Sequence, residues 1–161
     1  MGEKSGPLFP YERAWQVGID ARMKYAPNGE LACVAGSLRR GAEMVHDVDV
    51  LVCRNSHISG PDMIHEMVPF GDGRMIQVDI RFIRSDSWGP ALQYFTGSWK
   101  HNVSVRRIAK QRGLIANEYG VFRLSDNKRV DDGTEWGFYQ AIGLRWLPPE
   151  YRNGFIGGSK K

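Results

Sequence analysis

The chain has 161 residues, of which 42% are hydrophobic and 25% charged, which indicates one globular unit with room for a smaller subdomain. No segment approaches the roughly 18 consecutive apolar residues of a membrane span, and the first residues lack the apolar core of a secretion signal. We therefore expect a soluble, intracellular protein, and we expect Cys33 and Cys53 to be free thiols rather than a disulfide or a zinc site.

The formal net charge of +4 is unevenly distributed. Residues 1–80 carry eight basic and eleven acidic side chains, whereas residues 81–161 carry fourteen and seven. A basic half of this kind fits a nucleic-acid partner, although an ordinary solvated surface has the same composition.

The first half of the chain predicts a helix followed by strands. Apolar residues at three- and four-residue spacing predict a helix from Tyr11 to about Tyr25, which ends at a Pro-Asn-Gly turn. A short strand over 30–35, a Gly-Ser turn over 36–41 and a second, apolar strand over 47–54 are expected to follow. Residues 55–62 read as a loop, and two further strands flank a hairpin turn at 71–73.

The second half changes character. Residues 94–98 read as an aromatic turn, and residues 99–112 as a helix that ends at Gly113. Residues 117–120 suggest a turn into a strand over 121–123, and Thr134 is expected to cap a short helix that runs to about Ile142. Residues 154–161 are expected to form a flexible tail.

Three aspartates lie in phase on the predicted strands. Alternate strand residues point the same way, so Asp47 and Asp49 share one face while Val48 and Val50 face the core. The strand around Asp79 alternates in the same manner. Like charges held this close repel one another, and a bound divalent cation compensates for them. A lone Asp-x-Asp pair is often structural, but a third in-phase carboxylate favours a two-metal site.

The turn that precedes the first two aspartates adds phosphate-binding chemistry. The run Gly36-Ser37-Leu38-Arg39-Arg40-Gly41 places a hydroxyl, backbone amides and guanidinium groups within about a dozen residues of the paired carboxylates. This combination is what metal-assisted transfer of a nucleotide requires, since the turn can hold a triphosphate while the carboxylates hold Mg²⁺.

Several separate motifs between Val34 and Arg152 resemble those of the family X DNA polymerases, the group that includes DNA polymerase beta and very small viral repair polymerases. They are the Gly-Ser turn at 36–40, Asp47-Val48-Asp49, Val78-Asp79-Ile80-Arg81, Tyr94-Phe95-Thr96-Gly97-Ser98, Asn102 with Arg106, Asn117-Glu118-Tyr119 and Leu147-Pro148-Pro149-Glu150. The first three occur across nucleotidyltransferases, whereas the aromatic turn and the Asn-Glu-Tyr segment are specific to the family.

The resemblance implies an α+β fold and a division of labour. A nucleotidyltransferase palm over residues 1–90, with a mixed sheet and helices on one face, would precede a small α/β nucleotide-selection subdomain over 91–153. Asp47 and Asp49 would bridge two Mg²⁺ ions, for which Mn²⁺ is an alternative. Asp79 would bind the catalytic ion and take up the proton of the primer 3′-hydroxyl.

The resemblance also implies roles in binding. The nucleotide-binding set is Gly36, Ser37, Arg40, His46, Tyr94, Phe95, Gly97 and Asn102, with His46 offering its backbone amide. The DNA-binding set is Arg81, Arg106, Arg107, Lys110 and Tyr119, and Glu118 would belong to a closure switch. A cis peptide would fall at Gly97-Ser98. Read without the resemblance, Tyr94 and Phe95 are core aromatics, Arg106 and Arg107 a solvated helix face, and Glu118 a surface acid. His57, His65 and His101 read as ordinary polar residues.

These features predict a monomeric DNA-directed DNA polymerase of the short-gap repair type, with a DNA primer-template and a dNTP as partners. We expect it to be intracellular, cytoplasmic or nucleoid-associated, with a viral or otherwise minimal source. Only 35 residues precede Gly36, so we expect no lyase domain and no helix-hairpin-helix domain. The alternatives are a template-independent, RNA-directed or small-molecule nucleotidyltransferase, or a non-catalytic DNA-binding palm.

Overall fold

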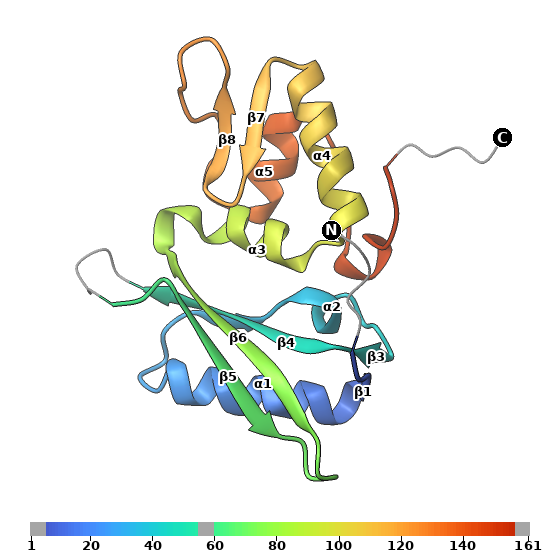
Figure 1. Ribbon diagram of the computed structural model, residues 1–161. Helices are drawn as coiled ribbons and strands as arrows, with labels where there is room; N and C mark the ends of the chain where they lie inside the picture. The colour runs from blue at the N-terminus through green and yellow to red at the C-terminus, as the bar shows by residue number, and fades with distance from the viewer. Residues whose placement is uncertain (1–5, 55–59, 157–161) are drawn as a thin grey trace, which may run out of the picture. The chain divides into compact units, whose positions relative to one another are not determined.

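The computed structural model describes residues 6–54 and 60–156. Contacts along the chain divide it into two compact units, Met1–Ile83 (unit 1) and Arg84–Lys161 (unit 2), and each is described here on its own (Figure 1). The expected loop at 55–62 and tail at 154–161 lie partly outside the described residues. None of the described helices is long and apolar enough to cross a membrane.

Unit 1 is built on a four-stranded sheet with the strand order β2-β4-β6-β5. The strands are β2 (Ala32–Val34), β4 (Asp47–Arg54), β5 (Met63–Pro69) and β6 (Met75–Arg84). Helix α1 (Tyr11–Tyr25) packs on β4 and β2, and the short helix α2 (Gly36–Arg39) also contacts β4. A two-stranded pair, β1 (Phe9–Pro10) with β3 (Met44–Val45), completes the unit.

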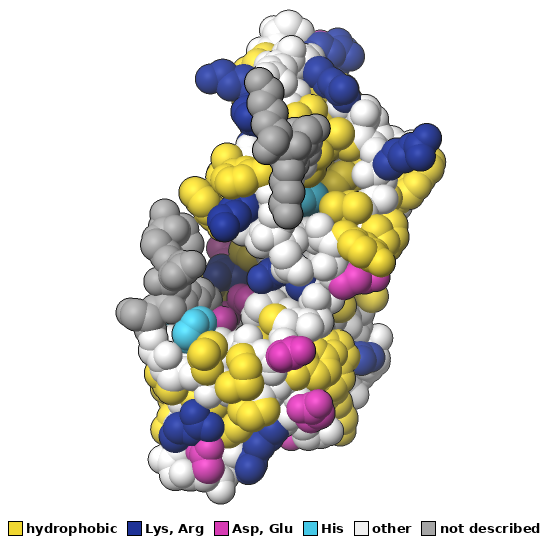
Figure 2. All heavy atoms as spheres, turned by 90° about the vertical axis from the view of Figure 1, so that its right-hand side faces the viewer, with side chains coloured by type: hydrophobic (Ala, Val, Ile, Leu, Met, Phe, Trp, Pro, Cys, Tyr) yellow, Lys and Arg dark blue, Asp and Glu magenta, His cyan; other side chains and the backbone are white. Residues whose placement is uncertain are grey.

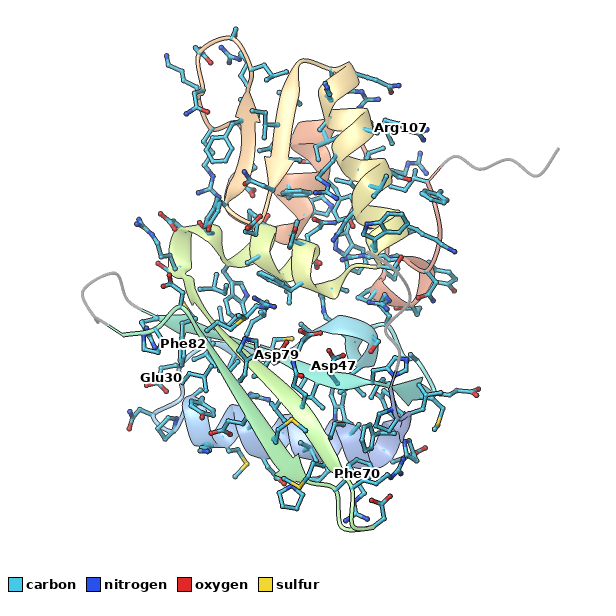
Figure 3. The ribbon with its side chains drawn as sticks, viewed as in Figure 1. Glu30, Asp47, Phe70, Asp79, Phe82 and Arg107 are labelled. Atoms are coloured by element: carbon cyan, nitrogen blue, oxygen red, sulfur yellow. The ribbon has the colours of Figure 1, made fainter. Side chains whose placement is uncertain are left out.

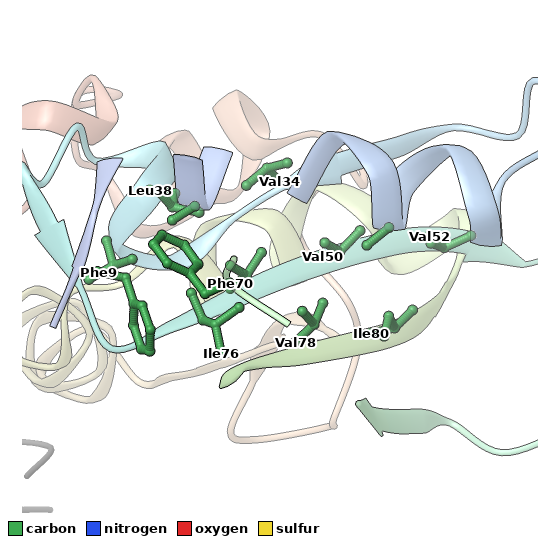
Figure 4. Packing of buried hydrophobic residues seen from close by; sticks show 13 residues of the cluster. Phe9, Val34, Leu38, Val50, Val52, Phe70, Ile76, Val78 and Ile80 are labelled. Atoms are coloured by element: carbon green, nitrogen blue, oxygen red, sulfur yellow. The ribbon is translucent and has the colours of Figure 1, made fainter. Parts of the chain in front are cut away.

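The core of unit 1 follows from alternation along β4 and β6. Val48, Val50, Val78 and Ile80 are fully buried, and they belong to one apolar cluster that includes small residues of α1 (Figure 4). Alternate strand residues face opposite sides of a sheet. Because these four side chains face the core, their polar neighbours along the strands lie on the other face of the sheet.

Helix α1 lies close to the sheet because its facing residues are small. Ala14, Gly18 and Ala21 are buried, and a Cβ atom added to Gly18 would lie 2.9 Å from the side chain of Val34. A larger residue at position 18 would push the helix away from β2 and β4.

The β5–β6 hairpin has a register that its turn determines. Phe70 donates its backbone N–H to the carbonyl of Arg74, and Pro69 pairs with Met75. Stepping four residues along each antiparallel strand from that pair brings His65 opposite Asp79. The turn at 71–73 therefore decides which side chain of β5 stands beside the third aspartate.

Unit 2 packs three helices and a hairpin around a second core. Its elements are α3 (Trp88–Thr96), α4 (Trp99–Gln111), β7 (Leu114–Asn117), β8 (Gly120–Arg123) and α5 (Glu135–Ile142), with short 3₁₀ turns at Ser85–Ser87 and Pro149–Tyr151. The core cluster includes Val105 and Ala109 of α4 and Phe138 and Tyr139 of α5. The predicted Thr134 cap is confirmed, since its hydroxyl accepts the N–H of Gly137 at 2.9 Å.

Buried Arg152 connects the C-terminal segment of unit 2 to α5. Arg152 is fully buried and forms an ion pair with Glu135 at 2.7 Å. Its Nε donates to the carbonyl of Leu147, and its own carbonyl accepts the N–H of Ser98 at 3.0 Å. Four residues further on, the N–H of Ile156 donates to the Ser104 hydroxyl, so the chain lies on α4 at the first residues of the expected tail.

The fold class is confirmed, two local predictions are wrong, and one strand was not predicted. The Gly-Ser segment is the short helix α2 rather than an open turn, and Tyr94, Phe95 and Thr96 form the last turn of α3. Strand β7, which the sequence did not indicate, pairs with β8 as a hairpin. The predicted helices at 11–25, 99–112 and 135–142, and the predicted strand at 47–54, are confirmed to within one residue.

Candidate active site

The three predicted carboxylates lie on neighbouring strands of the unit 1 sheet. Asp47 and Asp49 are half-buried on β4, and Asp79, only 6% exposed, is on the adjacent strand β6 (Figure 3). Each alternates with the buried apolar residues of its strand, which places all three on the face away from α1. The sheet therefore presents oxygen donors from two strands on one side.

Asp79 is held by two neighbours. Its Oδ1 accepts a hydrogen bond from Nε2 of Gln77 at 2.7 Å and lies 2.7 Å from Nδ1 of His65, the residue opposite it on β5. An ionised carboxylate has only acceptors, so Nδ1 of His65 is the donor in this contact. No described residue donates to the other oxygen, Oδ2.

Gly36 explains how Asp49 is accommodated. The glycine has a φ of +61°, and a Cβ atom at this position would lie 2.2 Å from Oδ2 of Asp49. Only glycine fits here on both counts, because other residues disfavour positive φ and would collide with the carboxylate. The first residue of the predicted phosphate-binding segment thus lies directly against a predicted metal ligand.

Ser37 and Arg40 follow on the same segment and are half-buried. Burial lowers the pKa of the Arg40 guanidinium, and the nearby negative charge of Asp49 raises it in part. Two other predicted site residues lie in this unit. Nδ1 of His46 is 3.1 Å from the carbonyl oxygen of Pro7, and Arg81 is half-buried on β6 in phase with Asp79.

The donor set fits a hard divalent cation. Carboxylate oxygens are the ligands that Mg²⁺ prefers, and Oδ2 of Asp79 has no hydrogen-bond donor among the described residues. As the side chains stand in residues 6–54 and 60–156, no three His, Cys, Asp or Glu side chains form a closed metal cluster.

In unit 2, the predicted nucleotide-binding residues gather where α3 meets α4. Tyr94 and Phe95 are half-buried with their rings edge to face at 5.2 Å, and Gly97 has a φ of +72°. The peptide bond between Gly97 and Ser98 is cis, as expected. Asn102 does not lie on an open face of α4, because the residue is buried.

The amide of Asn102 bridges the two helices. Its Nδ2 donates to the carbonyl of Tyr94 at 2.7 Å, and its Oδ1 accepts from the side chain of Gln93 at 3.1 Å. Each group keeps capacity for one more hydrogen bond, since the amide has two N–H groups and the oxygen two lone pairs. Asn102 therefore fixes the backbone beside Tyr94 whatever else it binds.

The predicted DNA-binding residues of unit 2 are exposed. Helix α4 carries Lys100, Arg106, Arg107 and Lys110 without any acidic residue, and all four are exposed. In the view of Figure 2, basic side chains project from both the upper and the lower parts of the molecule. Tyr119 is 61% exposed at the tip of the β7–β8 hairpin, beside the half-buried Glu118.

Comparisons with known proteins show what the chain as a whole is similar to. The family described as DNA polymerase beta thumb matches residues 91–153. The PolX DNA polymerase/3′-5′ exonuclease of Bacillus subtilis is 32% identical over 133 residues, which span 73% of this chain and 23% of that protein. Rat DNA polymerase lambda is 29% identical over 188 residues, which span 90% of this chain and 33% of that protein. Together these matches support membership of the family X DNA polymerases.

A solved structure shows the same fold. The Leishmania infantum polymerase beta ternary P/T complex superimposes with a TM-score of 0.74 at 20% identity, covering 92% of this chain and 77% of that chain. The present chain spans about a quarter to a third of the length of its curated family X relatives. The matched segment 91–153 begins within α3 and ends one residue after the buried Arg152.

Sequence reasoning missed one residue of the site. The sequence predicts an ordinary polar residue at His65, whereas in the structure its ring contacts the carboxylate of Asp79. The contact between His65 and Asp79 can be predicted from the hairpin, because a turn centred on 71–73 fixes the cross-strand partner of every residue on β6.

Proposed function

We propose that this chain is a DNA-directed DNA polymerase that adds a deoxynucleotide to a primer 3′-hydroxyl with two Mg²⁺ ions, acting inside the cell as a monomer on short gaps. The observation that carries the proposal is the set of three carboxylates on adjacent strands, with Gly36 pressed against Asp49. Family membership supports DNA polymerisation in general.

In this proposal the residues of unit 1 perform the chemistry. Asp47, Asp49 and Asp79 would hold the two ions, which when bound would supply positive charge to offset the negative charge that develops as the 3′-oxygen attacks the α-phosphorus and pyrophosphate leaves. Oδ2 of Asp79 takes up the proton of the 3′-hydroxyl. Ser37 and Arg40 hold the β- and γ-phosphates, for which the guanidinium supplies fixed positive charge.

Unit 2 selects the nucleotide and contributes to DNA binding. Tyr94 and Phe95 border the sugar, and Gly97 lets the backbone approach it closely. Asn102 offers its remaining amide hydrogen-bond capacity to the minor-groove edge of the incoming base. The exposed cations of α4, among them Arg106, bind DNA phosphates.

Primer extension with Mg²⁺ and dNTPs tests the proposal. Asp49→Ala should lower the rate about a thousand-fold, which corresponds to about 4 kcal/mol of transition-state stabilisation. Asp20→Ala is the matched control, because Asp20 is an exposed acid of α1 whose carboxylate accepts a hydrogen bond from Gln16. Extension by Asp49→Ala at the wild-type rate would refute the assignment.

The same assay separates the alternative functions. Incorporation that follows the template base supports a templated polymerase, whereas addition independent of that base identifies a template-independent transferase. Failure to bind dNTP in the presence of Mg²⁺ identifies a non-catalytic DNA-binding palm.

A further inference from the structure

We propose that His65 is a positioning residue for Asp79: with Gln77 it occupies Oδ1, so that Oδ2 alone faces the metal ion and the primer. This inference rests on the proposed function of the three-carboxylate site. It concerns the orientation of one carboxylate rather than the identity of the ligands.

The argument begins with the capacity of the oxygen atom. A carboxylate oxygen has two lone pairs, and Oδ1 of Asp79 has two contacts at 2.7 Å, with Nε2 of Gln77 and Nδ1 of His65. The oxygen is therefore saturated by the protein. The carboxylate plane is set by these two bonds, so Oδ2 is the oxygen that would bind an ion.

Backbone pairing brings His65 to this place. His65 and Asp79 are direct partners across the antiparallel β5–β6 pair, so their side chains lie on the same face of the sheet. Gln77 lies two residues before Asp79 on the same face. Both donors belong to strands, His65 to β5 and Gln77 to β6, so the sheet itself fixes the orientation of the Asp79 carboxylate.

The exposure of the two side chains fits a positioning role. The side chain of His65 is 54% exposed and that of Asp79 is 9% exposed, so the ring stands at the surface and covers a nearly buried carboxylate. Replacing the ring removes little buried apolar surface, and the fold of unit 1 does not rest on it. The contact needs only an N–H on Nδ1, which the imidazole ring carries in its neutral Nδ1–H form.

Two substitutions separate the hydrogen bond from the ring. Asn places an amide N–H at the same distance from the backbone as Nδ1, whereas Val keeps a good strand residue without any donor. We expect His65→Val to weaken Mn²⁺ binding, measured by calorimetry with the metal alone, about ten-fold, and His65→Asn to restore most of it. Met67→Ala, an exposed neighbour on the same face of β5, is the matched control.

Primer extension adds a kinetic readout. We expect His65→Val to lower kcat about ten-fold with Mg²⁺ and to leave the KM for dNTP within two-fold, since phosphate binding lies with Ser37 and Arg40. Thermal melting checks that each variant is folded. In the wild-type chain, NMR should show a ring proton on Nδ1 of His65 that is lost on Asp79→Ala substitution, which removes the acceptor.

Each result decides the inference. Wild-type Mn²⁺ affinity in His65→Val, or equal impairment of His65→Asn and His65→Val, would overturn it. If His65→Val does not fold, absence of the Nδ1 proton signal in the wild-type chain overturns it and its presence supports it. A wild-type chain that binds Mn²⁺ but extends no primer refutes the proposed function, while the metal-binding series still tests His65.

Discussion

Gly36→Ala tests whether the α2 segment and the carboxylates form one site. The substitution places a Cβ atom 2.2 Å from Oδ2 of Asp49, whereas ordinary contacts begin at 3.4 Å. The carboxylate must therefore move by roughly 1 Å, and a displacement of that size costs about 100-fold in rate at a catalytic centre. The positive φ of Gly36 adds about 1–2 kcal/mol of backbone strain.

Gly41→Ala is the control that separates strain from displacement. Gly41 has a φ of +72°, and nothing lies within 4 Å of the Cβ atom that alanine would add. Urea denaturation should show a similar loss of about 1–2 kcal/mol for both variants. Primer extension should fall about 100-fold only for Gly36→Ala. Equal extension rates for the two variants would refute the reasoning that Gly36 positions Asp49.

Three further predictions concern stability and DNA binding. Arg152→Met removes the buried cation that pairs with the Glu135 side chain, which is 10% exposed, so the free energy of unfolding should fall by about 3 kcal/mol in urea, and a loss below about 1 kcal/mol would contradict the importance of the pair. Arg107→Ala should lower the slope of the logarithm of DNA affinity against the logarithm of salt concentration by about one, whereas Lys24→Ala, which alters unit 1, should leave the slope unchanged. The hydrogen bond from Lys24 holds the pKa of Glu66 below its usual value of 4.5, so the stabilisation is complete above that pH and is lost as the pH falls through the lower folded value. In the Glu66→Gln variant the melting temperature should accordingly fall less steeply with decreasing pH below about pH 4.5. The same pH dependence in the variant and the wild type would show that the contact contributes nothing to stability.

The parts of the fold that were predictable are those in which local pattern and burial agree. The strand at 47–54 alternates acids with valines, and α1 repeats small apolar residues at helical spacing, so each pattern has one reading. The cap at Thr134 is equally local, since hydroxyl and amide are three residues apart.

Other elements depend on contacts that no local pattern contains. Helix α2 has four residues, too few to be stable alone, and it exists because it packs on β4. The last turn of α3 contains aromatic and β-branched residues, which favour strands, and packing within unit 2 overrides that preference. The sequence therefore suggested turns where the structure has helix.

The candidate site divides in the same way. Alternation alone placed Asp47, Asp49 and Asp79 on one side of the sheet. Helical spacing placed Asn102 on a face with Arg106 and Lys110, but it could not show that α3 covers the first turn of α4 and buries that amide. The spacing of residues along a helix predicts which side of the helix each residue occupies. It does not predict where a neighbouring helix begins and ends.

The turn between β5 and β6 has a consequence for insertions and deletions. A single residue added at 71–73 would shift β5 against β6, and every side chain of β5 would change its cross-strand neighbour. Two residues added at the tip, one to each strand, would lengthen the hairpin and leave His65 opposite Asp79. Insertions or deletions of an even number of residues in this hairpin therefore preserve the pairing of His65 with Asp79. An odd number gives Asp79 a different cross-strand partner, although no amino acid in either strand has changed.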